Sequence, residues 1–309
     1  MPSTKEIKGR MKSVSDTQKI TNAMYMIAST KMRRAKAELD KTRPYFDALR
    51  TEIERVFQVD RKVQSRYFIS EKSPVKEFRT YGCLVITADK GLAGAYNQNV
   101  LKEAQRLYEE YPHDKFYVVG EYGRRYFERR NIPMEHTFLY TAQNPTIRRA
   151  REISSVILEA YESGVIDDLF IIYTDLKNSV SEQVKTERLL PFPRAFFIKE
   201  KEEIQEKEFE FVPSIETVLN NCVRNFIPGY IYGALVDSFC SEQNARMEAM
   251  SAASDNAQKI LDHLSLQYNH ARQAAITREI TEVSAGAKAQ RKKKQAKADA
   301  KRGETVEHR

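Results

Sequence analysis

The sequence predicts an α/β domain joined to a long antiparallel coiled coil of two helices, one from each end of the chain. Neither residues 10–43 nor residues 234–285 contain glycine or proline, so each stretch can form a long uninterrupted helix. Between them, short apolar runs alternate with amphipathic segments, which is typical of βαβ units on a largely parallel sheet. We therefore expect helical arms at residues 1–60 and 210–290, a central α/β domain at 75–200 and a basic tail at 291–309.

The N-terminal arm carries a heptad seam, in which mostly apolar residues recur at alternating steps of four and three. This spacing places them on one helix face and is typical of a coiled coil. Pro44 should kink the helix or weaken one of its hydrogen bonds. The seam consists of Ile7, Met11, Val14, Gln18, Thr21, Tyr25, Ala28, Met32, Ala35, Leu39, Thr42, Phe46, Leu49, Ile53 and Val56.

The C-terminal arm has a seam in which alanine predominates, and such small side chains permit two helix backbones to approach closely. Two long helices near opposite ends of a chain can pair antiparallel once the central domain brings the chain back. We expect Gly286 to interrupt this helix. The seam consists of Ala253, Ala257, Ile260, Leu264, Tyr268, Ala271 and Ala275.

The central region combines strands with helices. Residues Tyr81–Thr87 form an apolar run with β-branched members, which indicates a buried strand. Further strands are predicted at 116–119, 169–173 and 183–190. Helices are predicted at 97–108, 121–130 and 145–162.

The charge of the chain is concentrated near its ends. The tail 291–309 contains eight Lys or Arg and three Asp or Glu, so it carries +5 of the net charge of +8. A second basic stretch runs from Lys5 to Arg43. Basic stripes attract acidic partners, which include nucleic acid, anionic lipid and acidic protein, and composition does not choose among these.

Cysteine usage and hydropathy indicate the compartment. Cys83, Cys222 and Cys240 show no CxxC spacing, so we expect free thiols in a reducing compartment. No stretch approaches about 18 consecutive apolar residues, the length that a transmembrane helix needs. These features predict a cytosolic bacterial protein.

One motif suggests chemistry, and it is weak. Residues Ala88–Asn97 (ADKGLAGAYN) follow a predicted strand and open a helix, where phosphates often bind. The segment lacks GK[ST] and a full GxGxxG, so a tight glycine turn is the favoured interpretation. The histidines show no ligand spacing and no GxSxG occurs. We therefore predict no catalytic, cofactor-binding or metal-binding residues.

Three segments, taken in order, resemble one family. They are TQKITNAMYMIASTKMRRAK at residues 17–36, ITADKGLAGAYN at 86–97, and ITREITE at 276–282 followed by GAKA at 286–289. Together they resemble the γ subunit of F-type ATP synthases, over nearly the whole chain. The resemblance implies two terminal helices in an antiparallel coiled coil and a Rossmann-like central domain.

The resemblance also implies a function. The γ subunit is the rotor of the central stalk, and it couples rotation of the membrane c ring, driven by hydrogen ion or sodium ion transport, to conformational cycling of the catalytic β subunits. Its implied partners are the α and β subunits of the catalytic ring, ε and the c ring. It is implied to be a peripheral protein at the cytoplasmic face of the bacterial cell membrane, without catalytic residues and without inserting into the membrane.

Residues that match the family's motifs are expected to contact these partners. The expected β-subunit contacts are Arg272, Gln273, Thr277, Glu279, Glu282, Lys31, Arg33, Arg34, Lys36, Asp89 and Lys90. The bearing of the shaft is expected at Met24, Ile27, Ala285, Gly286 and Ala287. The family usually ends soon after Ala289, so the resemblance gives the tail 291–309 no role, and we expect rotation not to require it.

Two other functions compete with this one. The basic ends also suit a coiled-coil adaptor that binds nucleic acid, although the chain has no recognisable reader fold. The strand–glycine–helix turn also suits an α/β enzyme with helical arms. Steeply salt-dependent DNA binding would favour the adaptor, and nucleotide bound by the isolated chain would favour the enzyme.

Overall fold

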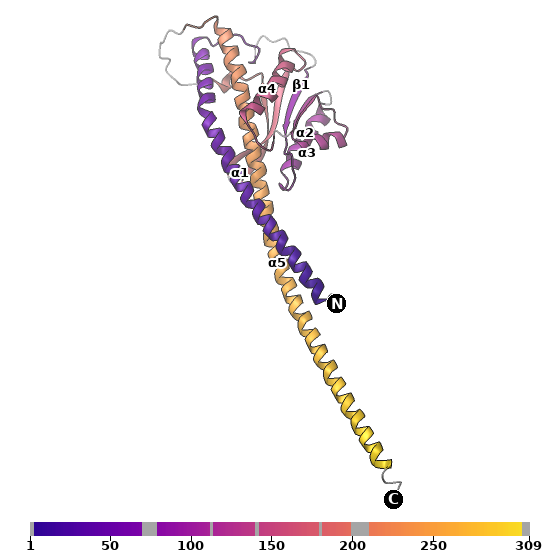
Figure 1. The fold of residues 1–309 in the computed structure, drawn as a ribbon. Coiled ribbons are helices and arrows are strands. Elements are labelled where there is room, and N and C mark those ends of the chain that lie inside the picture. Colours follow the sequence, from indigo (N-terminus) through magenta and orange to yellow (C-terminus); the bar gives the residue numbers. More distant parts are fainter. Residues whose placement is uncertain are drawn as a thin grey trace. The chain divides into compact units, whose positions relative to one another are not determined.

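Two long helices and a central sheet make up the computed structural model (Figure 1), which describes residues 3–69, 79–111, 114–139, 142–178, 181–198 and 210–304. Helix α1 spans Thr4–Val59 and helix α5 spans Ile215–Glu304. Residues 24–250 form one compact unit, here called the sheet unit. Residues 1–23 and 251–309 form the other, here called the terminal unit.

The helical arms were predicted correctly as elements, but the predicted break at Gly286 is wrong. Gly286 does not interrupt α5, which continues to Glu304. A glycine inside a helix costs only about 1 kcal/mol, so strong helix formers on both sides can carry the helix through it. Pro44 lies inside α1 without ending it.

The sheet contains five strands in the order β3-β2-β1-β4-β5. These are β1 (Tyr81–Ile86), β2 (Lys115–Val119), β3 (His136–Phe138), β4 (Asp168–Asn178) and β5 (Ser181–Leu190). Strands β1 to β4 are parallel, and β5 pairs antiparallel with β4. The prediction of a largely parallel sheet is thus confirmed. Strand β3 was not predicted, because three residues are too few to show a pattern.

Three helices connect the parallel strands, and a short 3-10 helix follows β5. They are α2 (Tyr96–Glu110), α3 (Glu121–Arg129), α4 (Ile147–Glu162) and η1 (Arg194–Phe196). Alternate residues of β1 enter different cores, as the period of two along a strand requires. Cys83 and Val85 pack in a cluster with residues of α2 and α3, whereas Leu84 and Ile86 pack in a cluster with residues of α1, α4 and α5. The sheet is therefore covered on both faces.

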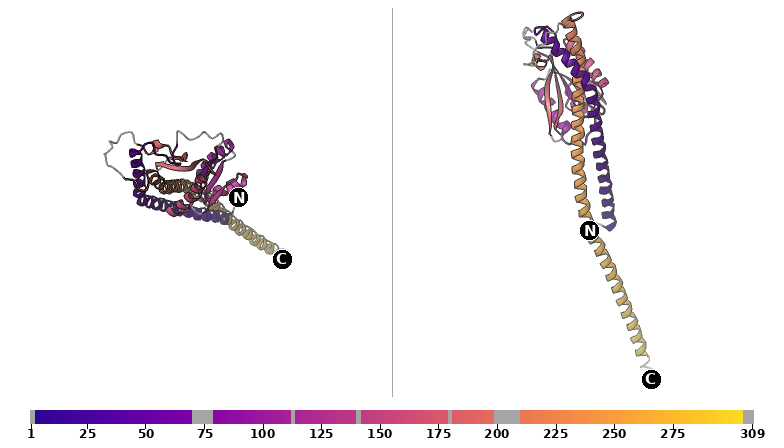
Figure 2. Two further views of the ribbon diagram at one scale, coloured as in Figure 1. Left: turned by 90° about the horizontal axis from the view of Figure 1, so that it is seen from above. Right: turned by 90° about the vertical axis from the view of Figure 1, so that its left-hand side faces the viewer.

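Helices α1 and α5 run antiparallel in the sheet unit, where they lie alongside each other (Figures 1 and 2). The Sγ atom of Cys240 lies 4.0 Å from the carbonyl oxygen of Met32. Phe46 lies against Gly229, so rising numbers along α1 meet falling numbers along α5. In the terminal unit, the Gln18 side chain donates hydrogen bonds to Gln258 Oε1 (3.1 Å) and to the Ser254 carbonyl (3.5 Å). Knobs-into-holes packing, which defines a coiled coil, stays a prediction.

Burial follows the predicted seam of α1 closely. Every seam position is buried or half-buried except Tyr25, which is exposed. In α5, Ala253, Ala257, Leu264, Tyr268 and Ala271 are likewise covered. Two positions of that seam were predicted wrongly. Ile260 is exposed and the half-buried Leu261 takes its place, while Ala275 lies beyond the last covered turn.

The packing of Phe46 on Gly229 generates a prediction. A Cβ atom at Gly229 would lie 2.0 Å from Phe46 Cδ1, so Gly229→Ala should lower the free energy of unfolding by about 1–3 kcal/mol, because the ring must move. Gly233 lies one turn further along α5, and a Cβ atom added there would meet nothing within 4 Å, so Gly233→Ala should raise stability by about 0.5–1 kcal/mol. Urea titration of both variants measures the difference. Equal effects of the two substitutions would contradict the helix register.

Candidate partner-binding surfaces

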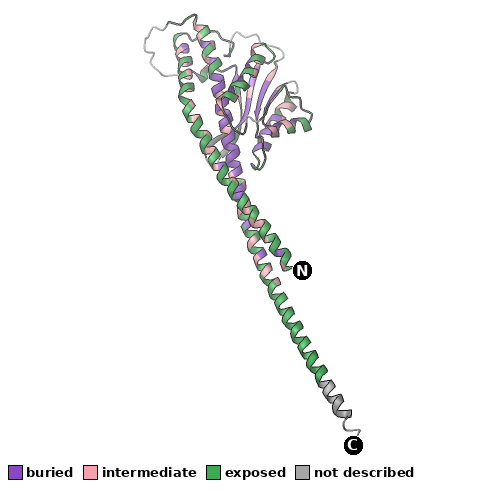
Figure 3. Cartoon of the chain, viewed as in Figure 1, coloured by how far each residue is buried: buried purple, intermediate pink, exposed green. Residues whose placement is uncertain are grey.

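The C-terminal part of α5 is an unpaired helix. All residues from 272 to 294 are exposed (Figure 3), and Ala271 is the last half-buried position in the described chain. Ile276, Ile280 and Val283 are 48%, 63% and 73% exposed, and their spacing places them on one face. A solitary helix with an exposed apolar face is marginal in water, so this segment needs cover from another molecule.

Many of the expected partner contacts fall on this unpaired helix. The side chains there are free of the rest of the described chain, except for local bonds such as that from the Thr281 hydroxyl to the Thr277 carbonyl (2.7 Å). The expected residues in this segment are Arg272, Gln273, Thr277, Glu279, Glu282, Ala285, Gly286 and Ala287.

The loop between β1 and α2 is the second candidate surface, and it is anchored within the sheet unit. The Arg246 guanidinium on α5 donates to the Gly91 carbonyl (3.0 Å) and to Glu242 Oε1 (2.6 Å). Asp89 Oδ1 accepts the backbone N–H of Glu121 (2.9 Å), the first residue of α3. Asp89 therefore has a structural role at the start of α3, which its sequence neighbourhood did not reveal.

A hollow of about 260 Å³ lies beside this loop. Met24, Ile27 and Lys31 of α1 line it together with Lys90 of the loop and Glu242 of α5. Four of these residues were expected from the sequence as partner contacts or bearing, and the fold brings them together from separate segments. Glu242 is the addition that sequence reasoning missed.

Leu92 at the rim of this hollow is strained and exposed. Its φ angle is 62°, a left-handed conformation that costs a residue with a Cβ atom about 1–2 kcal/mol. Its side chain is 65% exposed, so packing within the described chain offsets little of that cost. The loop thus presents an apolar side chain to the outside at an energetic cost, which favours a role in binding.

The basic residues of α1 act partly on the chain's own buried carboxylates. Lys31, Arg33, Arg34 and Lys36 are all exposed. Burial raises the pKa of Glu242, and the charge of Lys31 opposes that rise after that of Arg246. The charge of Lys31 therefore acts on a carboxylate of the chain itself as well as being exposed to a partner.

Comparison with known proteins identifies the family. The family model described as ATP synthase matches residues 3–290. The ATP synthase gamma chain of Acetivibrio thermocellus is 39% identical over 291 residues, covering 92% of this chain and 98% of the relative.

This chain belongs to the ATP synthase gamma chain family.

Solved structures agree with this assignment. A chain of the Tetrahymena thermophila mitochondrial ATP synthase central stalk and c ring is 26% identical, with a TM-score of 0.57, and the match covers 76% of this chain and 99% of that one. A chain of the Euglena gracilis mitochondrial ATP synthase shares the fold at 15% identity, with a TM-score of 0.64, covering 93% and 94% of the two chains.

Membership of the gamma chain family decides between the functions that the sequence left open. Gamma chains are non-catalytic subunits of the ATPase complex, so the α/β enzyme is not supported. The comparisons equally give no support to a nucleic-acid adaptor. No helix in the described ranges is long and apolar enough to cross a membrane.

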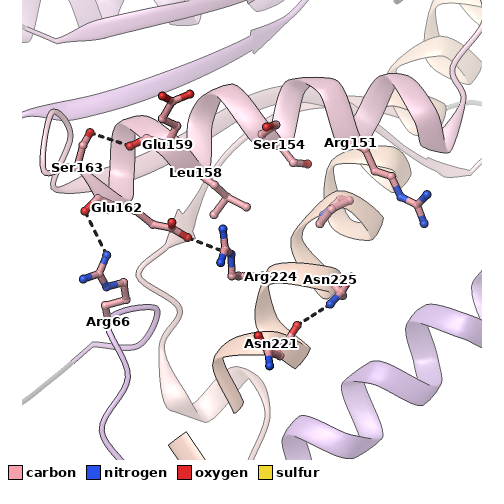
Figure 4. A pocket seen from close by; sticks show the side chains of 12 residues that line it. Arg66, Arg151, Ser154, Leu158, Glu159, Glu162, Ser163, Asn221, Arg224 and Asn225 are labelled. Atoms are coloured by element: carbon pink, nitrogen blue, oxygen red, sulfur yellow. Dashed lines mark hydrogen bonds and ion pairs between the residues drawn. The ribbon is translucent and has the colours of Figure 1, made fainter. Parts of the chain in front are cut away.

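A polar cleft of about 860 Å³ between α4 and the beginning of α5 was not expected from the sequence (Figure 4). Glu162 is at its centre. Its carboxylate accepts the Tyr67 hydroxyl and lies 3.2 Å from Arg224 Nε, and its carbonyl accepts Arg66 Nη1 at 3.1 Å. Arg66 and Arg224 each contact Glu162, so the cleft ties the segment 61–69 to α4 and α5.

A half-buried carboxylate on α5, Asp237, generates a pH prediction. The pKa of Asp237 is raised to about 6, first by burial and then by the charge of Asp175, while Lys185, Arg43 and Lys36 oppose the rise. Above pH 6 the carboxylate is charged in both folded and unfolded chains, so its desolvation cost is fully present. As pH falls from 6 towards 4, only the folded chain takes up the proton, and stability increases.

Asp237→Asn should therefore raise the free energy of unfolding at pH 7.5 by about 1–3 kcal/mol, at about 1.4 kcal/mol per unit of pKa. It should also flatten the dependence of stability on pH between 4 and 6. Denaturant titrations across this range provide the measurement. Asp255→Asn changes an exposed carboxylate on the same helix and serves as the control. Parallel pH profiles for the wild-type chain and Asp237→Asn would refute the assignment.

Proposed function

We propose that this chain works as the central-stalk rotor of an F-type ATP synthase, at the cytoplasmic face of a bacterial cell membrane. It would couple ion-driven rotation of the c ring to the conformational cycle of the catalytic β subunits, and so to ATP synthesis or hydrolysis. The partners in this proposal are α, β, ε and the c ring. The observation that carries the proposal is the exposed helix 272–294. In this member of the gamma chain family, that helix has an apolar face that no other described residue of the chain covers.

The mechanism follows from stiffness and asymmetry. Paired helices transmit torque because bending either one costs the contacts along its partner. The unpaired end of α5 fits a sleeve formed by the α and β subunits, where small residues let the helix slide. Each β subunit would meet a different face of the shaft at each angle, and differential contact of this kind is what shifts a conformational equilibrium. The chain itself needs no catalytic residue for this.

Each expected surface takes a place in the proposal. Arg272, Gln273, Thr277, Glu279 and Glu282 supply polar contacts to β within the sleeve. The bearing comprises Met24, Ile27, Ala285, Gly286 and Ala287. The hollow beside the β1–α2 loop, with Lys31, Lys90 and the exposed Leu92, supplies a lower contact with β. Arg33, Arg34 and Lys36 add positive charge on the same helix as Lys31, while Asp89 contributes through the loop that it anchors to α3.

Co-purification tests the proposal directly. The tagged chain, expressed in its native cells and extracted from membranes with mild detergent, should bring down α, β, ε and c subunits together with ATPase activity. An Ile276→Asp, Ile280→Asp variant supplies a matched bait with the apolar face removed, and it should recover much less α and β. Recovery of the wild-type chain without any of these subunits would overturn the proposed function.

Loss of two polar contacts should weaken coupling without unfolding the chain. Arg272→Ala with Gln273→Ala removes side chains that are exposed in the free chain, so thermal unfolding of the isolated chain should change little. A charged hydrogen bond to a partner contributes about 1.5–3 kcal/mol, so the purified complex should lose roughly ten-fold or more in ATPase rate or in yield. The control is Asn256→Ala with Lys259→Ala, two exposed residues on the part of the same helix that pairs with α1. Unchanged yield and unchanged ATPase rate would refute these contacts.

A further inference from the structure

A basic segment of α5 lies beyond the part that relatives share. The family model ends at residue 290, whereas α5 continues to Glu304. The first four residues after that end are Arg291, Lys292, Lys293 and Lys294, here called the collar, and all four are exposed. The last covered position of the helix, Ala271, is roughly 30 Å away at about 1.5 Å per residue.

The collar carries charge on every side of the helix. Successive residues of an α-helix are rotated by about 100°, so four consecutive cations point in four directions around the axis. A helix that docks on one partner surface concentrates its contacts on one face instead. No ion pair joins the collar to any carboxylate among the described residues of the chain.

This charge destabilises the helix when it stands alone. Lys288 and Lys292 are four apart, and Arg291 and Lys294 are three apart, so like charges face each other along the surface. Each such pair costs about 0.2–0.5 kcal/mol. The helix dipole favours cations only within its last turn, and the collar lies ten residues before Glu304, so the dipole does not offset the repulsion. Counter-charge from another molecule would remove the cost.

We infer that the collar is an electrostatic centring element that fits an acidic protein surface surrounding the helix. This rests on the proposed function, under which other subunits enclose residues 272–290 and therefore lie next to the collar. With cations on all sides, attraction to encircling carboxylates changes little as the helix turns. The collar thereby resists sideways movement of the shaft without creating preferred angles.

Crosslinking of the purified complex with a carbodiimide tests this inference. The reagent joins a lysine directly to a carboxylate that it contacts. Isopeptide links from Lys292, Lys293 and Lys294 to more than one neighbouring chain, mapped by mass spectrometry, are the expected result. They should disappear at about 1 M salt, where screening acts within about 3 Å. Links to one surface only, or no links while Lys31 or Lys90 does react, would overturn the inference. A chain that enters no complex would overturn the proposed function instead.

Two variants of equal charge test the role of symmetry. Lys292→Gln with Lys293→Gln leaves cations about 60° apart on one side of the helix, whereas Arg291→Gln with Lys293→Gln leaves them about 160° apart. At low salt the one-sided variant should hydrolyse ATP about two-fold more slowly than the two-sided one, since surface ion pairs contribute about 0.2–1 kcal/mol and now vary with angle. The difference should vanish at high salt. Equal rates at low salt would overturn the centring role.

Discussion

Residues 215–250 of α5 pack between the sheet and α1, and this double burial is the constraint on which the rest of the molecule depends. One apolar cluster contains Ile227, Ile231 and Leu235 of α5 together with Ile171 of β4 and Ile53 of α1. A helix that is covered on opposite sides has few positions where a charged or polar side chain can reach solvent. From Ile231 to Arg246 nearly every position is buried. The helix that carries the exposed segment 272–294 is therefore firmly held at its root in the sheet unit.

Several polar residues in that stretch are matched to specific partners, as most buried polar groups are. The backbone of Thr174 on β4 is held twice by α5, since its N–H donates to the Ser238 hydroxyl (3.3 Å) and its carbonyl accepts the Ser241 hydroxyl (3.4 Å). Arg246 likewise joins Glu242 to the β1–α2 loop. These bonds specify one rotation of α5 about its axis, which apolar contacts alone would leave less well defined.

Much of the fold follows from local sequence patterns, and much of the surface chemistry does not. The seam of α1 from Ile7 to Val56 is periodic and the strand at Tyr81–Ile86 is a continuous apolar run, so the sequence predicts both well. The predicted break at Gly286 is wrong because the continuity of a helix depends on the helix-forming residues on both sides of a glycine and not on the glycine alone. The role of Asp89 and the placement of Lys31 and Glu242 around one hollow depend on contacts across long sequence separations, which no local pattern contains. The unpaired segment 272–294 was located by family motifs, while its complete exposure required the structure.

The antiparallel contact of the two ends also imposes an order in time on synthesis. Helix α1 is complete at Val59, but its partner in the sheet unit begins only at Ile215. A ribosome adding about 5–20 residues per second needs roughly ten to thirty seconds to make the intervening chain. Throughout that interval the apolar seam of α1 lacks the helix that it pairs with in the folded chain. The nascent chain must therefore avoid aggregation through this surface. The polar seam residues Gln18, Thr21 and Thr42 reduce its apolar area and so lower the tendency to aggregate.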